Sequence, residues 1–163
     1  MRRYISIIGL WLFVAAGGVA LAQDFTLPDA QGVNHRLSDY RGKWVVVNYW
    51  ASDCQPCLDE MPELSAFHDR HKDKDAVVLG VNMDGMDAPV LREFAEDHFL
   101  SYPVLRASVN YQSPLGPIPG FPTTYLISPA GDIAASHLGG LSSEMIEQFI
   151  RKQGPRSVVS VKR

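Results

Sequence analysis

The sequence predicts a single α/β domain in which helices cover the faces of a central mixed β-sheet. Its 163 residues suffice for one domain, and apolar runs of strand length alternate along it with amphipathic segments of helical length. Their order, strand–helix–strand–helix–hairpin–helix, combines a parallel βαβ unit with an antiparallel ββα unit, and the two units can share one sheet. Hydrophobic residues make up 46% and charged residues 20%, which excludes a fully disordered chain, and a net charge of −3 predicts no nucleic-acid partner.

The first 22 residues are typical of an export signal. Two arginines near the start provide positive charge, an uncharged and mostly apolar run follows, and the run closes on the small residues Ala20 and Ala22. A retained membrane anchor is the alternative, because the run approaches spanning length. We expect residues 1–22 to be a signal peptide, cleaved or kept as an anchor, and residues 23–163 to be an exported domain in the periplasm or another oxidising, extracytoplasmic compartment.

Apolar periodicity places the elements in the first half of the domain. Residues 24–42 carry repeated turn signals and predict loops with short extended pieces. A mostly apolar run that is rich in β-branched and aromatic residues then predicts a buried strand, and apolar residues at helical spacing predict the helix that follows it. The predicted elements are a strand over 44–50, a turn over 51–54, a helix over 55–71, a strand over 76–83, a helix over 87–99 and a short strand over 102–105.

The second half begins with a segment that interrupts regular structure. Six of the ten residues from 113 to 122 are Gly or Pro, and these residues favour turns. A Pro-Ala-Gly turn then separates two apolar runs, and Ser142 is a suitable N-cap for the last amphipathic segment. The predicted elements are hairpin strands over 123–128 and 132–137 and a helix over 142–153.

The two cysteines, Cys54 and Cys57, lie where the first buried strand turns into the first long helix. A C-x-x-C pair at this junction indicates redox chemistry. Unpaired N–H groups and the positive end of the helix dipole favour a thiolate there, and the thiolate is the nucleophile. We expect the outer Cys54 to attack a disulfide and Cys57, one turn inside the helix, to resolve the mixed disulfide, with no metal and no cofactor other than the redox-active disulfide. Pro56 suits the first helical turn, because its missing N–H has no partner there.

Other interpretations of the cysteine pair are weaker. A purely structural disulfide would close a very short loop, and the entropic stabilisation by a disulfide grows with loop length. A zinc site would need His68, but His68 lies 11 residues beyond Cys57 on one predicted helix, roughly 16 Å away at about 1.5 Å per residue. Chance cysteines in the core would not explain the position of the pair at a helix start in an exported chain.

The block around the cysteines resembles the active-site block of the TlpA/ResA/DsbE group of exported thiol–disulfide oxidoreductases. Residues 42–64 contain the pattern G-K-x-x-x-x-N-x-W-A-S-x-C-x-P-C-x-x-E-x-P, and the resemblance extends from about residue 24 to residue 153. It implies a thioredoxin-like fold with an N-terminal β-hairpin extension and a central strand–helix insertion, which residues 73–105 can hold.

The resemblance also implies further site residues. The segment Gly120 to Thr124 is similar to the cis-proline loop of the family. A cis bond between Phe121 and Pro122 would present free backbone groups, next to Thr123, to an extended substrate segment. Trp50 belongs either to the core or to a wall of the site, and the same resemblance favours the wall.

Proton handling at the inner cysteine is expected to differ from that of thioredoxins. Asn48 stands where those proteins carry a buried acid, and it cannot titrate, although the TlpA-like group shares this asparagine. Glu60 matches the acid of the family's C-x-x-E-x-P pattern and is a candidate for exchanging the proton of Cys57. The simpler interpretation of Glu60 is an acid in the first helical turn that interacts with the helix dipole.

Two residues depart from the family's commonest pattern. Asp53 stands where tryptophan is common, and a carboxylate beside Cys54 opposes thiolate formation. We hypothesise that Asp53 raises the pKa of the Cys54 thiol and makes the couple more reducing. The alternative is a solvated acid with little effect. Gln55 is also not the commonest residue at its position. This difference bears on the redox potential of the cysteine pair and not on the type of reaction that the pair performs.

The predicted function is reduction of protein disulfides outside the cytoplasm. The resemblance implies protein substrates, including apocytochrome c before haem attachment, and recharging by a membrane thiol–disulfide electron carrier; we expect a monomer. The alternative is a periplasmic copper-binding chaperone that combines Cys54 and Cys57 with Met83 and Met86, because thiolate and thioether ligands suit Cu(I). A peroxidase is not favoured, since the chain lacks a P-x-x-x-T-x-x-C arrangement.

Overall fold

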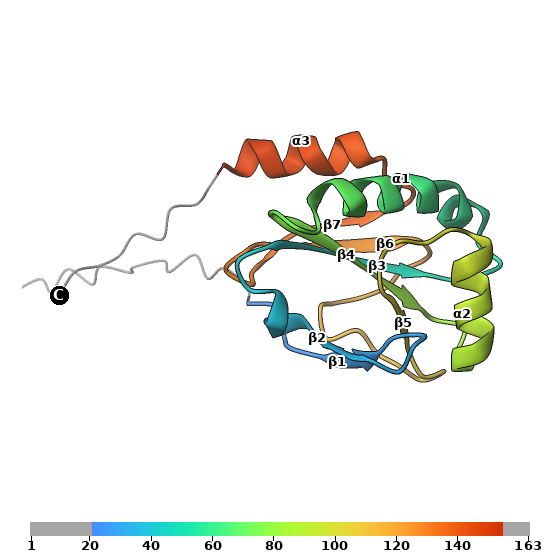
Figure 1. Ribbon diagram of the computed structural model, residues 1–163. Coiled ribbons are helices and arrows are strands. Elements are labelled where there is room, and N and C mark those ends of the chain that lie inside the picture. The colour runs from blue at the N-terminus through green and yellow to red at the C-terminus, as the bar shows by residue number, and fades with distance from the viewer. Residues whose placement is uncertain (1–20, 155–163) are drawn as a thin grey trace, which may run out of the picture.

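The computed structural model describes residues 21–154, which contain the predicted mixed sheet (Figure 1). The middle strand pairs in parallel with one neighbour and antiparallel with the other, as expected for joined βαβ and ββα units. In their order across the sheet, the strands are β5 (Val104–Arg106), β4 (Ala76–Asn82), β3 (Trp44–Trp50), β6 (Thr123–Ile127) and β7 (Ile133–Leu138).

The two central strands are buried over their whole length. All seven residues of β3 and all seven of β4 are buried, which explains why their sequences, apart from Asn48 and Asn82, are nearly continuous apolar runs instead of alternating ones. The register pairs Trp50 with Asn82 and Tyr49 with Thr123. The end of β3, the end of β4 and the start of β6 therefore lie together at one end of the sheet.

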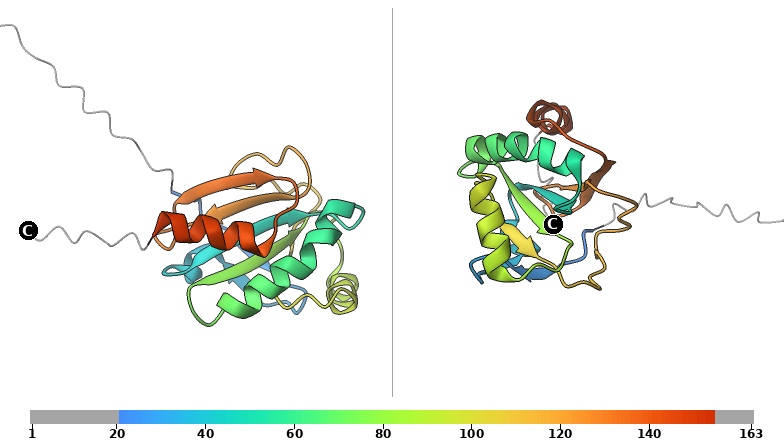
Figure 2. Two further views of the ribbon diagram at one scale, coloured as in Figure 1. Left: turned by 90° about the horizontal axis from the view of Figure 1, so that it is seen from above. Right: turned by 90° about the vertical axis from the view of Figure 1, so that its right-hand side faces the viewer.

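Three helices pack on one apolar cluster of the sheet. They are α1 (Gln55–His71), α2 (Ala88–Asp97) and α3 (Ser143–Gln153). Figure 2 shows α1 and α3 over the same face, and the cluster between the helices and the sheet includes Leu64, Phe67, Leu91 and Ile146. Ser142 caps α3 as predicted, because its side chain accepts a hydrogen bond from the Met145 N–H.

An N-terminal hairpin covers the opposite face of the sheet (Figure 1). It consists of β1 (Thr26–Pro28) and β2 (Asn34–Arg36), followed by a short 3₁₀ helix, η1 (Leu37–Tyr40). A hydrogen-bonded series holds these pieces together. His35 Nε2 lies 2.9 Å from Asp29 Oδ2, and His35 Nδ1 lies 2.6 Å from the Tyr40 hydroxyl. The hairpin extension implied by the resemblance is thus present.

Element boundaries differ slightly from those predicted. The second helix ends at Asp97 instead of residue 99, because Phe99 adopts a φ of 52° that stops the helix. Residues 1–20 and 155–163 lie outside the described residues, so the predicted signal peptide is described only at residues 21 and 22. Of the helices described between residues 21 and 154, none has the length and apolar character that crossing a membrane requires.

Candidate active site

Cys54 and Cys57 form a disulfide at the start of α1, just beyond the end of β3. Their Cα atoms lie 5.3 Å apart. Cys54 is the N-cap residue of the helix, and its sulfur accepts a hydrogen bond from the Cys57 N–H at 3.3 Å. Cys54 is half-buried, whereas Cys57 is 1% exposed. One sulfur is therefore within reach of another molecule and the other is shielded.

The first turn of α1 favours negative charge on the outer sulfur. Pro56 occupies this turn, where its missing N–H costs nothing, and the turn contains no acid. The N–H groups at a helix start lack partners within the helix, and the dipole places partial positive charge there. Reduction of the disulfide would therefore leave Cys54 in a position that stabilises a thiolate.

A buried carboxyl group lies one turn further along α1. Glu60 is 4% exposed; its Oε1 accepts a hydrogen bond from Asn48 Nδ2 at 2.7 Å, and its Oε2 accepts one from the Leu141 N–H at 2.8 Å. Burial raises the pKa of Glu60 to about 7, although the two hydrogen bonds oppose the shift. The interpretation of Glu60 as an acid in the first helical turn that interacts only with the helix dipole is wrong. Glu60 lies in the second turn and is buried.

The proline loop adjoins the first turn of α1. The Phe121–Pro122 bond is cis, as the resemblance implies. The Pro122 carbonyl accepts a hydrogen bond from the Gly139 N–H at 2.9 Å. The next residue, Gly140, is so placed that a Cβ atom there would lie 3.9 Å from the Pro56 carbonyl oxygen. These contacts bring the cis-proline loop and the cysteine motif to the same end of the sheet.

Two of the residues expected to bind a substrate or shape the site are buried. Trp50 is fully buried and stacks on Phe94, with ring centroids 5.0 Å apart, so its side chain belongs to the core and does not form an open wall of the site. Thr123 is 2% exposed, and its hydroxyl donates to the Gly120 carbonyl at 2.6 Å. Both side chains support the site from behind.

The two unusual motif residues are exposed. Asp53 and Gln55 both lie at the surface beside Cys54. The Gln55 side-chain amide donates to Asp59 Oδ1 at 2.8 Å, which holds it along the helix. The structure thus leaves Asp53 free to influence an approaching substrate or the outer sulfur.

One further residue supports the cysteine turn and was not expected from the sequence. Asp84 Oδ2 accepts hydrogen bonds from the Ser52 N–H and from Asn82 Nδ2, both at 2.8 Å. Asn82 is fully buried at the end of β4. Because Ser52 lies two residues before Cys54, this contact ties the turn that carries the reactive sulfur to the neighbouring strand. Asp84 follows the turn by about 30 residues and carries no local signal.

The residues of the alternative metal sites are engaged elsewhere. His68 is buried, and its Nδ1 accepts a hydrogen bond from the Val78 N–H at 3.1 Å. Met83 packs against the cluster under the N-terminal hairpin, whereas Met86 packs against the cluster under the helices. Met86 therefore shares a cluster with the cysteines, but Met83 lies in the other one, so the two methionines and the cysteines are not gathered in one place.

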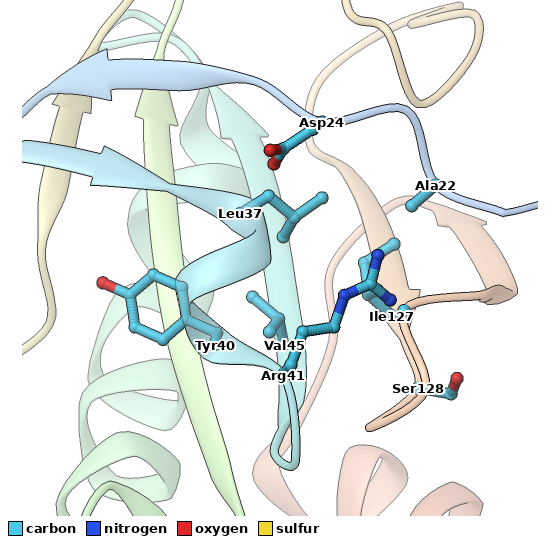
Figure 3. A pocket seen from close by; sticks show the side chains of 9 residues that line it. Ala22, Asp24, Leu37, Tyr40, Arg41, Val45, Ile127 and Ser128 are labelled. Carbon is cyan, nitrogen blue, oxygen red and sulfur yellow. The ribbon is translucent and has the colours of Figure 1, made fainter.

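A small hollow at the other end of the sheet does not qualify as a binding site. Figure 3 shows Arg41 extending between Leu37 and Ile127. The hollow measures about 10 Å³, which is room for no more than one water molecule. The residues around the hollow have a structural role. The Arg41 guanidinium contacts the Ala130 carbonyl and lies where a side chain on Gly131 would stand.

The fold and the cysteine geometry together define the class of protein. Thiol–disulfide exchange needs an accessible sulfur that attacks and a neighbouring sulfur that closes the ring. This arrangement sits at the start of a helix in a thioredoxin-like fold. The protein is a disulfide oxidoreductase.

Comparisons with known proteins identify the family. The AhpC/TSA family matches residues 20–136, and the chain belongs to this family. Over 145 residues the chain is 35% identical to thiol-disulfide oxidoreductase ResA of Geobacillus kaustophilus, a match that covers 87% of this chain and 80% of the relative. The resemblance to the TlpA/ResA/DsbE group is thereby confirmed.

Solved structures agree with this assignment. A putative thiol:disulfide interchange protein DsbE from Chlorobium tepidum matches with a TM-score of 0.72 and 30% identity, over 82% of this chain and 94% of that one. The exposed lipoprotein thioredoxin of Streptococcus pneumoniae matches with a TM-score of 0.69 and 28% identity, over 80% of this chain and 99% of that one.

Proposed function

We propose that the protein is an exported reductase of protein disulfides that serves cytochrome c maturation by reducing apocytochrome c before haem attachment. The observation that carries the proposal is the cysteine pair: Cys54 is reachable and caps α1, and Cys57 is shielded directly behind it. The names of the relatives support disulfide chemistry. The cytochrome substrate rests on the family resemblance.

The proposed reaction moves two electrons from the dithiol to a substrate disulfide. The Cys54 thiolate attacks one substrate sulfur, so that a Cys54–substrate bond forms, the substrate S–S bond breaks, and the leaving sulfur takes up a proton. Deprotonated Cys57 then attacks the Cys54 sulfur, forms the intramolecular disulfide and releases the second substrate thiolate, which also takes up a proton. The protein disulfide itself carries the electrons, so the cycle needs no further cofactor.

Glu60 is proposed to exchange the proton of Cys57. It lies three residues after Cys57, on the same face of α1. A group with a pKa of about 7 is well matched to proton exchange near neutral pH. Asn48 cannot titrate and holds the Glu60 carboxyl in place through its amide.

Export, partners and oligomeric state belong to the same proposal. The N-terminal pattern supports export, and a similar solved protein is described as an exposed lipoprotein. Each turnover leaves the pair oxidised, so a reductant must restore it, and the family resemblance points to a membrane thiol–disulfide carrier. Because one chain supplies both cysteines, a monomer is sufficient.

The redox equilibrium of the Cys54–Cys57 pair with glutathione tests the direction of the reaction. We expect a reduction potential closer to that of thioredoxin, about −270 mV, than to that of a strong oxidase, about −120 mV. A potential in the oxidase range would defeat the assignment as a reductase. The substrate is tested with a disulfide peptide containing C-x-x-C-H, whose reduction should be lost in Cys54→Ser.

The effect of Asp53 is tested separately. If its carboxylate opposes thiolate formation, Asp53→Asn should lower the pKa of the Cys54 thiol and make the couple less reducing. Thiol titration of the reduced variant measures this directly. An unchanged titration would show that Asp53 is a solvated acid without influence on the sulfur.

A further inference from the structure

Two polar atoms that are buried behind the cysteine motif have no hydrogen-bond partner among the described residues. They are Trp50 Nε1 and the Tyr102 hydroxyl oxygen. Trp50 is fully buried, and Tyr102 is 3% exposed. A buried polar group without a partner destabilises a fold, and an internal water molecule is the usual partner where the protein supplies none. The two atoms therefore point to a site for bound water.

Both side chains lie over Gly80 of β4. A Cβ atom on Gly80 would stand 2.7 Å from the Tyr102 ring and 3.3 Å from Trp50 Nε1, so glycine is needed for this close approach. The register pairs Gly80 with Asn48 of β3, and paired residues face the same side of the sheet. Asn48 donates to the Glu60 carboxyl on that side. The two unpartnered atoms thus lie next to the Asn48–Glu60 hydrogen bond.

The electrostatics of this cluster agree with that placement. Burial and, to a smaller extent, the Glu60 carboxylate raise the pKa of Tyr102, so its hydroxyl stays protonated. The His68 ring lies 6.3 Å from the Tyr102 ring, and burial lowers the pKa of His68 to about 4, so this histidine is neutral at pH 7. Cys57 is the remaining titratable group in the cluster, and α2 covers Trp50 with Phe94 while its charged side chains are exposed. Glu60 is therefore the group in the cluster that changes charge near neutral pH.

We propose that Trp50 Nε1 and the Tyr102 hydroxyl bind an internal water molecule, and that this water donates a hydrogen bond to the Glu60 carboxylate. The water then has three partners, the usual number for a buried water molecule. Glu60 has room for it, because each carboxyl oxygen has one hydrogen-bond partner among the described residues. Tyr102 is thus a positioning residue for Glu60. This inference rests on the proposed function, in which Glu60 exchanges the proton of Cys57.

The first test is the titration of Glu60 in the oxidised protein, where the cysteines do not titrate. Carbon-13 NMR of protein labelled in its glutamate carboxyl groups follows the titration, and Glu60→Gln identifies the signal. A donor stabilises the charged carboxylate, so loss of the hydroxyl in Tyr102→Phe should raise the pKa of Glu60 by roughly 0.5 to 1. Tyr111→Phe is the matched control and should leave this pKa unchanged. The Tyr111 hydroxyl is also buried, but Tyr111 packs against the cluster under the N-terminal hairpin.

The pH dependence of disulfide reduction distinguishes positioning from structural support. If Tyr102 acts through Glu60, the midpoint of the change in kcat/KM near neutral pH should move upward in Tyr102→Phe by the same amount as the pKa of Glu60. The highest value of kcat/KM should stay the same. A purely structural role would lower kcat/KM at every pH and leave the midpoint in place, and this result would overturn the inference.

The outcomes separate this inference from the proposed function. An unchanged titration of Glu60 in Tyr102→Phe overturns the inference, although disulfide reduction by the cysteines stands. If the pKa of Glu60 rises but kcat/KM of the wild-type protein does not change with pH near 7, the water site is supported and the proposed role of Glu60 fails. A high-resolution crystal structure of the wild-type protein needs no substitution. It should show an ordered water molecule within hydrogen-bonding distance of Trp50 Nε1, the Tyr102 hydroxyl and Glu60, and a dry contact there would overturn the inference.

Discussion

The two halves of α1 use polar side chains in opposite ways. In the first half, Cys57 and Glu60 are buried against the sheet, and the Glu60 carboxyl has only neutral donors as hydrogen-bond partners among the described residues. In the last turns, Arg70 pairs with Glu147 of α3 at 2.8 Å, in contact with solvent. One helix therefore carries a shielded chemical group at its start and a solvated ion pair near its end.

The environments of the two carboxyl groups shift their pKa values in opposite directions. Burial raises the pKa of Glu60 to about 7. The hydrogen bond from Arg70 holds the pKa of Glu147 below its ordinary value. An acid becomes useful for proton exchange near neutral pH where the fold excludes both water and positive charge. The comparison predicts that changes in the first half affect activity and changes in the last turns affect little.

The largest expected effect is that of Glu60→Gln on activity. Loss of the proton-exchanging group should lower kcat/KM for peptide disulfide reduction at pH 7 by between about tenfold and about a hundredfold. The substitution should also remove the change of kcat/KM with pH that Glu60 causes near pH 7. Glu63→Gln is the matched control, because Glu63 lies on the same helix and is exposed. Equal effects of both variants would contradict a special role for Glu60.

The second expected effect concerns stability against pH. Folding raises the pKa of Glu60 from 4.5 to about 7. The contribution of Glu60 to the free energy of unfolding is therefore present below pH 4.5 and is lost as the pH rises through 7. Burial lowers the pKa of His68 from 6.5 to about 4. The contribution of His68 to the free energy of unfolding is therefore present above pH 6.5 and is lost as the pH falls through 4. Each contribution is on the order of 2 kcal/mol after allowance for solvent screening.

These two contributions oppose each other between pH 4.5 and 6.5, and single variants should separate them. In His68→Asn the free energy of unfolding should fall as the pH rises through this window. In Glu60→Gln it should rise. Urea unfolding at several pH values measures both slopes, and identical slopes in the two variants would be inconsistent with these assignments.

A smaller effect is expected from the contact that holds the cysteine turn. Asp84→Ala and Asp84→Asn both remove the charge, but only Asn keeps an acceptor for the Ser52 N–H. If this hydrogen bond positions Cys54, Asp84→Ala should react with a disulfide about fivefold more slowly than Asp84→Asn, as expected for a bond of about 1 kcal/mol. Stopped-flow rates of the two reduced variants give the comparison, and equal rates would assign no positioning role to Asp84.

The smallest effect is expected from the ion pair between α1 and α3. Arg70 is 48% exposed, and surface pairs of this kind contribute less than about 1 kcal/mol. Arg70→Ala should therefore lower the free energy of unfolding only slightly, less so at high salt, and should leave disulfide reduction unchanged. A marked loss of activity would show that the two halves of α1 are coupled.

The features that the sequence predicted correctly have local signals. The run from 44 to 50 is apolar except for Asn48, because both faces of β3 are covered. Ser142 carries the signal of an N-cap, and the Cys54–Cys57 spacing matches one helical turn. The cis proline also has a local signal, because the short segment from Gly120 to Thr124 resembles the cis-proline loop of the family.

The features that the sequence did not predict depend on residues far apart in the chain. Glu60 is enclosed by Asn48 and by the backbone of Leu141, which lies 81 positions away. Trp50 is covered by Phe94 of α2 and therefore belongs to the core. No pattern within one element records such contacts, because they arise only when the helices dock on the sheet.

Trapping of the mixed disulfide tests the central claim most directly. Reduced Cys57→Ser, mixed with a disulfide peptide and analysed by mass spectrometry, should accumulate a stable peptide adduct on Cys54, because the resolving sulfur is absent. Reduced Cys54→Ser should accumulate almost none, since Cys57 is 1% exposed. Rapid adduct formation on Cys57, or none on Cys54, would contradict the assignment of the attacking and resolving cysteines.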